Sequence, residues 1–410
     1  MVTIDPERFR ETFERYSEIG RTDADGLHRL ALSEEDREVR DRFVSDLEDL
    51  GLEVRIDRIG NTFGRAEGTD PDAEPVLVGS HLDSQPYGGR FDGQLGVLTA
   101  LETLRTFDDE GVDHRRPIEI VNWTNEEGSR FKPALMGSGA FTGELDLEEV
   151  LEHADADGVT VAEALEEIGY RGEAPAEPRE PYHSALELHV EQGPKLEDQG
   201  LSVGVVEGVF GMAWLEVVVH GDADHAGPSP MYSRKDALVA ASDVVGAVRR
   251  LSNRLADDVV TTVGELEVEP GSINVIPSEV RFTVDVRSYD DAVVGDLVEA
   301  VEREVEAACE REGVEYDLEE IWRIPHTEFS PLVAETALAA ADDVGASHRA
   351  MVSGAGHDAS YVNEITDTAM LFVPSVDGKT HNEAEFTEWA DAEAGARVYA
   401  ETVERLANAE

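Results

Sequence analysis

Two adjacent glutamates follow an apolar run that has the composition of a buried strand. The run is "IEIVNW", residues 118–123, and Glu126 and Glu127 come shortly after it, directly before a glycine. Neighbouring side chains of an extended chain point to opposite faces. The two carboxylates are therefore expected to serve different purposes, which the pair by itself does not identify.

Histidines and further acids stand at the ends of other predicted strands. In open parallel sheets, ligand sites lie beyond the carboxyl ends of the strands. Four such ends carry possible ligands, and no cysteine is among them. Histidine and carboxylate ligands favour Zn, Mn, Ni or Co in an open site over a structural zinc cluster. The residues at these ends are His81, Asp83, Asp92, Glu126, Glu127, His189 and His381.

Each of these residues has an ordinary explanation when it is taken alone. A single histidine at a strand end is more often a hydrogen-bonded loop residue, and Asp92 could simply cap a helix. Asp83 could be a turn residue, and adjacent glutamates are common in so acidic a chain. Four independent strand ends that all offer histidine or acid favour a metal site, because the signals converge.

Short apolar strands alternate with helices at both ends of the chain. This alternation predicts an α/β fold with a mostly parallel sheet and helices on both of its faces. The predicted helices are residues 35–50 and 93–107, one from 331 and one from 387. The predicted strands are a strand or hairpin over 53–68 and strands at 75–80, 118–123, 186–194 and 368–374.

Residues 210–328 have a different pattern. The runs "WLEVVVHG" and "VRFTVDVRS" alternate apolar and polar residues, as half-exposed antiparallel strands do, and long amphipathic helices are predicted at 235–256 and 291–312. Strands on one side with helices on the other indicate a separate α+β domain. We therefore predict a catalytic domain formed by residues 1–209 and 329–410, interrupted by an inserted domain over 210–328.

With these residues in view, the sequence resembles the M20 metallopeptidase-like amidohydrolases. The resemblance is strongest to the branch of N-carbamoyl-L-amino acid hydrolases, β-ureidopropionases and allantoate amidohydrolases. It extends in order over nearly the whole chain. The matching segments are "GSHLDSQPYGGRFDG", "NWTNEEGSRFKPALMGSGAFTG", "ELHVEQGP", "DHAGPSPMYSRKDAL", "INVIPSEVRFTVDVR", "SGAGHDA" and "THNEAEF".

The resemblance implies two divalent metal ions per subunit, which would be Zn, or Mn, Co or Ni. The aspartate that bridges the two ions in the family corresponds to Asp92. His81 and His189 would complete the site of one ion, and Glu127 and His381 that of the other.

The resemblance also assigns the remaining acids of this cluster. Asp83, two residues after His81, would orient that imidazole without binding the metal itself. Since Glu127 is a ligand, Glu126 beside it is left as the general base for the attacking water, which the metal activates.

Further residues are implied to bind substrate. His225 would be read as a surface loop histidine on its own, but the resemblance implies that it crosses a dimer interface and stabilises the tetrahedral oxyanion. Asn274 and Arg287 resemble the family's substrate-binding pair. A bidentate guanidinium suits an α-carboxylate, although Arg287 could also be an ordinary strand-end arginine. Gln192 would line the same pocket, and Gly356 would contact substrate through its backbone.

Several functions remain open at this point. Hydrolysis of the ureido C–N bond of N-carbamoyl-L-amino acids is favoured over that of allantoate, because Ala213 and Trp214 stand where an allantoate enzyme is expected to have extra basic residues. An aminoacylase or dipeptidase is less expected, since His189 occupies a position where many peptidase relatives carry a carboxylate. A metal-binding scaffold without activity would have lost its base or a ligand, and every expected group is present.

The net charge of the chain is extreme. Asp and Glu total 90 against 34 Lys and Arg, of which four are lysines, for a formal charge of −56. The acids are spread along the whole chain, which indicates an adaptation to salt of the kind that halophiles use. Nucleic acid is not expected as a partner, because phosphate binding needs basic surface.

Targeting and redox features are few. No apolar run is long enough to span a bilayer, and the N-terminal segment has neither the basic nor the apolar region of a secretory signal. Cys309 is the one cysteine of the sequence, so an intramolecular disulfide is excluded. We expect a cytoplasmic homodimer that associates through the inserted domain and acts on a small molecule without binding membranes.

Overall fold

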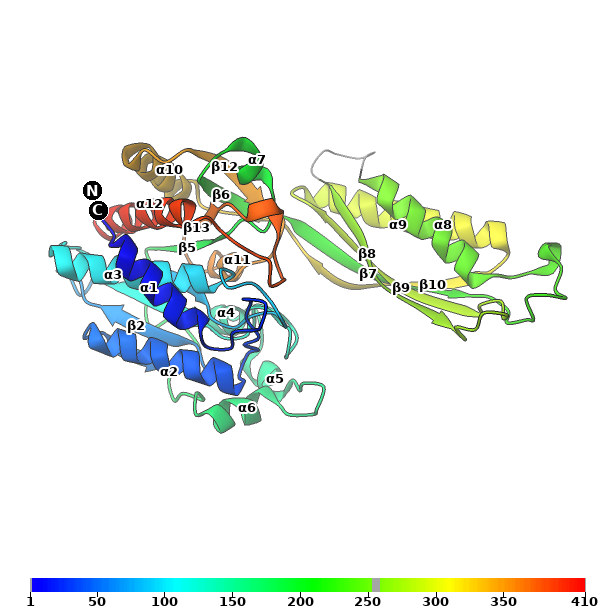
Figure 1. Cartoon of the computed structure of the whole chain (residues 1–410), viewed down its shortest axis with the longest axis horizontal. Helices are drawn as coiled ribbons and strands as arrows, with labels where there is room; N and C mark the ends of the chain where they lie inside the picture. Colours follow the sequence, from blue (N-terminus) through cyan, green and yellow to red (C-terminus); the bar gives the residue numbers. More distant parts are fainter. Residues whose placement is uncertain (1, 253–258, 410) are drawn as a thin grey trace. The chain divides into compact units, whose positions relative to one another are not determined.

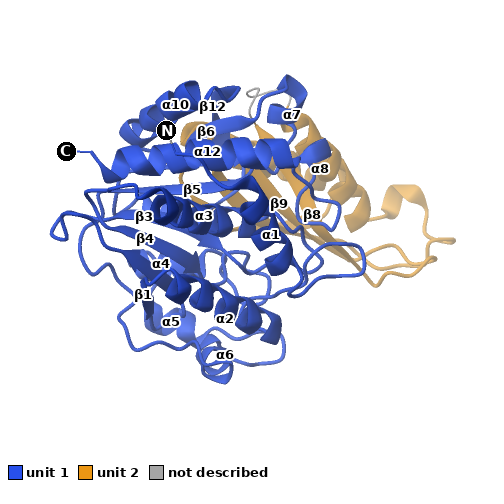
Figure 2. Cartoon of the chain, turned by 60° about the vertical axis from the view of Figure 1, so that its left-hand side comes forward, with its two compact units in different colours: residues 1–207, 329–410 blue, residues 208–328 orange. Residues whose placement is uncertain are grey.

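The computed structural model describes residues 2–252 and 259–409, which form two compact units. Unit 1 comprises Met1–Glu207 and Phe329–Glu410, and unit 2 comprises Gly208–Glu328 (Figure 2). These divisions lie within two residues of the boundaries expected from the sequence pattern. Among the described residues, no helix is both long and apolar enough to cross a membrane.

Unit 1 contains most of a nine-stranded sheet with the order β1-β2-β4-β3-β5-β13-β6-β11, in which β12 also pairs with β6. The strands β3, β4, β5 and β13 are buried along their whole length. The strands are β1 Glu53–Ile56, β2 Thr62–Ala66, β3 Val76–His81, β4 Ile118–Trp123, β5 Ser184–Val190, β6 Val203–Val209, β11 Thr327–Glu328, β12 His348–Ser353 and β13 Thr368–Val373.

The centre of this sheet is parallel. Strand β3 runs parallel to β4 and β5, and β5 runs parallel to β13. The flanking pairs β1–β2, β2–β4, β13–β6 and β6–β11 are antiparallel. The predicted α/β fold with a largely parallel sheet is thus confirmed. The carboxyl ends of β4, β3, β5 and β13 consequently meet at one edge.

Helices cover both faces of this sheet because successive strand residues point to opposite sides (Figure 1). In β3, Val76 and Val78 pack in the large core cluster with residues of α3 and α12, while Leu77 packs in a second cluster with Phe141 and Val362 of α4 and α11. The helices of unit 1 are α1 Pro6–Ser17, α2 Glu34–Asp49, α3 Gln94–Glu110, α4 Met136–Thr142, α5 Leu147–Glu152, α6 Val161–Ile168, α7 Lys195–Gln199, α10 Pro331–Val344, α11 Asp358–Val362 and α12 Trp389–Ala407.

Unit 2 is an antiparallel sheet of four strands in the order β10-β7-β9-β8, with two helices packed on one face (Figure 1). Alternate residues such as Leu215 and Phe282 form its core with the apolar sides of α8 and α9. The elements are β7 Gly211–His220, α8 Ala237–Leu251, β8 Val260–Glu269, β9 Glu279–Ser288, α9 Asp291–Glu312 and β10 Glu315–Ile324. The predicted helix over 235–256 ends at Leu251, and its residues 253–256 lie outside the described residues.

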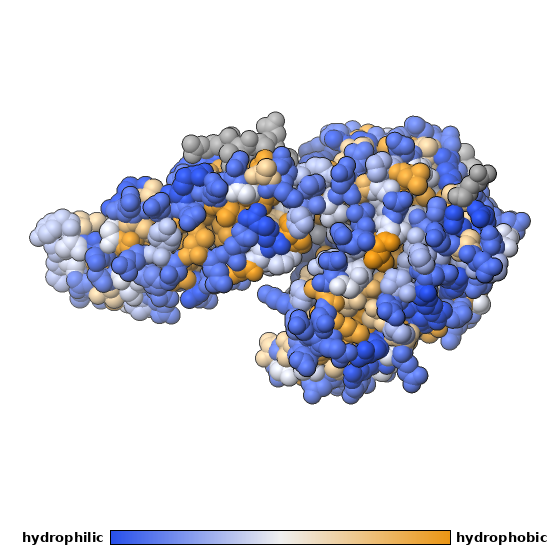
Figure 3. Space-filling model, turned by 180° about the vertical axis from the view of Figure 1, so that it is seen from behind, coloured by the Kyte–Doolittle hydropathy of each residue, from blue (hydrophilic) through white to orange (hydrophobic). Residues whose placement is uncertain are grey.

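Hydrophilic residues cover most of the face shown in Figure 3, where hydrophobic residues form scattered patches. Among the described residues most of the acids are not buried, so the negative charge lies mainly at the surface. The buried acids are a small group, and several of them lie at the carboxyl edge of the parallel strands.

Candidate active site

The side chains predicted to bind metal come together at the carboxyl edge of the parallel strands in unit 1. His81 is the last residue of β3, and His189 is the next to last of β5. Glu126 and Glu127 follow the end of β4, and His381 lies in the segment after β13. The tertiary fold therefore unites residues that are up to 300 positions apart in the chain.

One group of ligand atoms is fully buried. His189 Nε2 lies 3.1 Å from Asp92 Oδ1, and His81 Nε2 lies 3.5 Å from the same oxygen. The ligand atoms of these three residues all lie within 4.8 Å of one another. Two atoms that each bind a tetrahedral ion at about 2.1 Å lie about 3.4 Å apart, so the spacing fits a single divalent ion.

A second group uses the other oxygen of Asp92. His381 Nε2 lies 3.7 Å from Asp92 Oδ2 and 3.6 Å from Glu127 Oε2. The His381 side chain is 49% exposed, so this group is open to solvent whereas the first is not. Because Oδ1 faces one group and Oδ2 the other, the carboxylate of Asp92 has the arrangement of a bridge between two ions.

The ring of His81 supports this interpretation. Its Nε2 atom is buried and makes no hydrogen bond with the described residues, while its Nδ1 atom lies 3.1 Å from the main-chain oxygen of Asp83. With the Nδ1 proton donated to that oxygen, Nε2 presents a lone pair toward Asp92. A buried ring nitrogen that makes no hydrogen bond is costly unless a ligand binds it.

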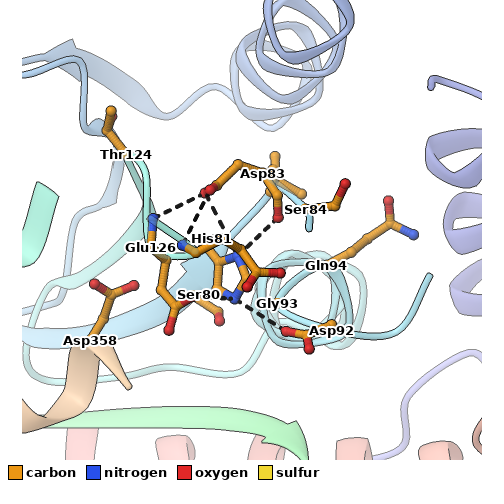
Figure 4. Close-up of polar contacts among 12 residues, drawn as sticks. Ser80, His81, Asp83, Ser84, Asp92, Gly93, Gln94, Thr124, Glu126 and Asp358 are labelled. Atoms are coloured by element: carbon orange, nitrogen blue, oxygen red, sulfur yellow. Dashed lines mark hydrogen bonds and ion pairs between the residues drawn. The ribbon is translucent and has the colours of Figure 1, made fainter. Parts of the chain in front are cut away.

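Asp83 contacts the ring of His81 through its main chain. Its carboxylate lies 3.7 Å from His81 Nδ1, so the carbonyl, not the carboxylate, holds the ring. The carboxylate instead accepts hydrogen bonds from the main-chain N–H groups of Glu126 at 3.2 Å and Glu127 at 3.3 Å (Figure 4). Asp83 thereby joins the loop after β3 to the loop after β4.

Asp92 is held in place by residues on several segments. Glu385 accepts a hydrogen bond from the main-chain N–H of Asp92 at 3.0 Å, and Gln192 Nε2 donates to Asp92 Oδ2 at 2.8 Å. The next residue, Gly93, has a φ of 62°, and a Cβ there would lie 2.3 Å from the ring of His81. The close approach of α3 to His81 therefore requires glycine at this position.

Two residues that contact these ligands were missed by sequence reasoning. Burial, followed by repulsion from Asp92, raises the pKa of Glu385 to about 8. Gln85 donates to Glu127 from its main-chain nitrogen at 3.0 Å and from its side chain at 2.7 Å. Both residues lie inside segments already singled out by motif, but a contact partner carries no signal of its own in one sequence.

Glu126 lies beside the first group without belonging to it. Its Oε2 atom is 3.5 Å from His81 Nε2, and Asp358 lies on its other side (Figure 4). Burial raises the pKa of Glu126 well above its usual range; the charge of His81 opposes this shift, and the nearby carboxylates of Glu127 and Asp358 reinforce it. A buried carboxyl with a raised pKa is suited to accept and release a proton near neutral pH.

Gly356 lies in the short segment between β12 and α11. A Cβ at this position would meet only Leu135, at 3.8 Å. Packing against the described residues therefore does not explain the glycine. The open space beside its backbone would allow a ligand to contact the main chain.

The remaining predicted residues lie in unit 2. His225 and Asn274 are exposed in neighbouring loops, where the N–H of Ala226 donates to the oxygen of Asn274 at 2.9 Å. Arg287 lies near the far end of β9 and pairs with Asp285, with Nη2 and Oδ2 2.8 Å apart. A strand rises about 3.3 Å per residue. The ten residues of β9 therefore separate Asn274 from Arg287. The two residues of this expected pair do not meet within a single copy of unit 2.

The chain is similar to known proteins in sequence and in fold. Residues 77–405 match the sequence profile of Peptidase family M20/M25/M40. An N-carbamoyl-L-amino-acid amidohydrolase from Rhizobium meliloti is 40% identical over 391 residues, covering 95% of this chain and 94% of that protein. An allantoate amidohydrolase from Escherichia coli K12 is 34% identical over 410 residues, covering 99% of each. The crystal structure of a hydantoinase/carbamoylase family amidase from Burkholderia multivorans is 44% identical with a TM-score of 0.94, covering 99% of this chain and 98% of that one.

Proposed function

The chain belongs to the M20/M25/M40 peptidase family and is a hydrolase of non-peptide C–N bonds, and from this we propose that it hydrolyses the ureido bond of N-carbamoyl-L-amino acids. The observation that carries the proposal is the pair of ligand groups that share Asp92, with the uncommitted carboxyl of Glu126 beside them. The products would be the L-amino acid, CO2 and ammonia.

We propose that two divalent ions occupy the two groups. His81, His189 and Asp92 would hold one ion, and Glu127, His381 and the second oxygen of Asp92 the other. Imidazole and carboxylate donors suit Zn, Mn, Co or Ni. When bound, such an ion lowers the pKa of water toward neutrality and polarises the carbonyl that is attacked.

The residues of the chain would then move the protons. Glu126 takes a proton from the attacking water as the C–O bond forms and gives it to the departing terminal nitrogen as the C–N bond breaks, which releases ammonia. The carbamate of the amino acid remains, and it decomposes to the amino acid and CO2. Each turnover thus consumes one water, and Glu126 returns to its starting state.

The family resemblance assigns the substrate carboxylate to Arg287, which would bind it in exchange for Asp285. A guanidinium binds a carboxylate through two parallel hydrogen bonds, a geometry that lysine does not offer. Allantoate is the second candidate, because relatives that hydrolyse allantoate cover nearly the whole chain. Their identity of 33–34% is lower than the 36–40% of the relatives named for N-carbamoyl-L-amino acids.

A substrate panel tests this proposal. Enzyme reconstituted with Mn, Co or Zn in molar KCl is expected to release ammonia from N-carbamoyl-L-amino acids faster than from allantoate, with little activity on the D-enantiomers or on dipeptides. Enzyme stripped by a chelator is the control. Faster release from allantoate would show that the second candidate is correct, and activity on dipeptides alone would contradict both.

We further propose that unit 2 forms a homodimer and that His225 acts in the site of the partner subunit. Closed two-fold dimers are the commonest assemblies of soluble proteins. A histidine in an exposed loop, fixed by the bridge between His225 and Val275, can donate to an oxyanion on another subunit.

Mixing two inactive variants tests the shared site. Glu126→Gln and His225→Ala are each expected to be inactive as homodimers, whereas a mixed dimer contains one site with an intact base and an intact histidine. Up to about a quarter of wild-type activity is therefore expected after random exchange of subunits, since half the dimers are mixed and each has one intact site. Absence of recovery after exchange has been verified by mass spectrometry would contradict the shared site.

A further inference from the structure

Arg29 is a cation buried inside unit 1, and its side chain has no exposed surface. The hydrogen bonds of its guanidinium all end on neutral oxygens, which are the main-chain oxygens of Tyr16, Ile19 and Leu82 and the side-chain oxygen of Gln94. Burying a cation that forms no ion pair is costly even though the carboxylates of Asp36 and Asp83 are near enough to attract it, so a role is needed to explain why arginine and not an apolar residue occupies this position.

The first segment that Arg29 contacts carries two residues of the candidate site, His81 and Asp83. Arg29 Nε donates to the oxygen of Leu82 at 2.6 Å, and Leu82 lies between His81 and Asp83. The main chain of Arg29 is also joined to Ser84 by two hydrogen bonds. The N–H of Arg29 donates to Ser84 Oγ at 2.9 Å, and the N–H of Ser84 donates to the oxygen of Arg29 at 2.9 Å.

The second segment that Arg29 contacts carries Asp92. Arg29 Nη2 donates to Gln94 Oε1 at 3.0 Å, and Gln94 lies two residues after Asp92, at the start of α3. The amide nitrogen of Gln94 donates to the main-chain oxygen of Arg90 at 3.1 Å and to Ser17 Oγ at 2.8 Å. Figure 4 shows Gln94 and Ser84 on the outer sides of the segments that place Asp92 and Asp83 around His81.

The third contact fixes the arginine itself. Nη1 donates to the oxygens of Tyr16 and Ile19, both at 3.2 Å, where α1 ends. A cation is favourable at the carboxyl end of a helix, because the last carbonyls of the helix have no partners inside it. One planar guanidinium thus reaches three segments in three directions, which a lysine amine cannot do with the same geometry.

We infer that Arg29 is a positioning residue of the metal centre, which sets the spacing between His81 and Asp92 by tying the segment 81–84 to the segment 90–94. The inference rests on the proposed metal ligation by His81 and Asp92. Arg29 does not touch the ligand atoms, so it acts through the main chain of Leu82 and the side chain of Gln94. Loss of such an outer partner typically weakens metal affinity by about 10–100-fold.

The test is the affinity of the full-length protein for Zn²⁺, measured by competition with a chromogenic chelator at fixed pH and molar KCl. Arg29→Lys is expected to bind Zn²⁺ about 10–100-fold more weakly than the wild type. The rise in melting temperature on adding Zn²⁺ should shrink in parallel, since stabilisation by a ligand follows its affinity.

Arg55→Lys is the matched control. Arg55 is also buried, but its contacts are Glu119, 3.4 Å away, and the ring of Phe63, and neither is near a ligand. This variant should lower the melting temperature of the metal-free protein while leaving the Zn²⁺ affinity at the wild-type value. An equal loss of affinity in both variants would overturn the inference, because it would show general destabilisation.

Gln94→Met keeps the test decisive if Arg29→Lys does not fold. It removes one of the two links and preserves the volume of the side chain, so a smaller loss of Zn²⁺ affinity is expected. If the wild type binds Zn²⁺ and the folded variants bind it equally well, Arg29 has no positioning role. If the wild type itself fails to bind any of Zn²⁺, Mn²⁺ or Co²⁺, the proposed metal centre is wrong, which is a distinguishable result.

Discussion

Replacement of Glu126 by glutamine is expected to lower turnover by about two to four orders of magnitude, the usual contribution of a positioned acid–base group. Glutamine has nearly the shape of glutamate but cannot accept a proton from water at neutral pH. The N–H of residue 126 would still donate to Asp83, because that bond uses the main chain. The metal content should stay at the wild-type value, which plasma mass spectrometry would measure.

Two further variants distinguish loss of the base from loss of a nearby carboxylate and from loss of metal. Glu191→Gln removes another carboxylate close to this edge of the sheet, which only accepts hydrogen bonds from the N–H groups of Lys195 and Leu196, so activity should be kept. Asp92→Asn should instead lose metal from both groups. If the turnover of the Glu126→Gln enzyme stayed within a few-fold of the wild-type value, another group would be the base.

The melting temperature is expected to rise steeply as KCl is increased from about 0.01 M to 1 M, because the Debye length falls from about 30 Å to about 3 Å. The formal charge of −56 is spread over the chain, and the thirty arginines and four lysines cannot balance ninety acids. Repulsion among carboxylates therefore opposes the folded state at low salt. We expect dissociation of the proposed dimer or unfolding as salt is removed.

Sucrose provides the control for this series. At equal osmolality it favours compact proteins by exclusion from their surface, but it does not screen charge. KCl should consequently stabilise the protein far more than sucrose does, at fixed metal concentration and pH. A flat or falling series in KCl would show that the acidic surface is no salt adaptation, and the proposed location in a salt-rich cytoplasm would lose its support.

The local sequence predicted elements that are mostly buried and elements whose apolar and polar residues alternate clearly. The strand over 118–123 and most of the helix over 93–107 are buried inside unit 1, so their mainly apolar composition identifies them. The strands β8 and β10 were not predicted. Their outer residues are exposed and acidic, as in "EYDLEEIWRI", and the general charge of the chain hides their alternation.

The sequence by itself also determined which residue types could bind metal. A histidine or carboxylate directly after an apolar strand lies at the sheet edge wherever that strand is parallel, and this follows from strand direction alone. The candidate ligands were therefore identifiable one by one. Their division between two ions came from the family resemblance and not from periodicity or spacing.

Only the tertiary structure decided how these groups contact one another. Whether the carbonyl or the carboxylate of Asp83 meets the ring of His81 depends on differences of well under 1 Å, which no periodicity encodes. Glu385 lies far from Asp92 in the chain and reaches it through the packing of the segment after β13, whereas Arg29 reaches Gln94 through the packing of α1 and α3. Sequence spacing governs contacts within a helix or strand, whereas contacts between segments are set by the packing of the whole core.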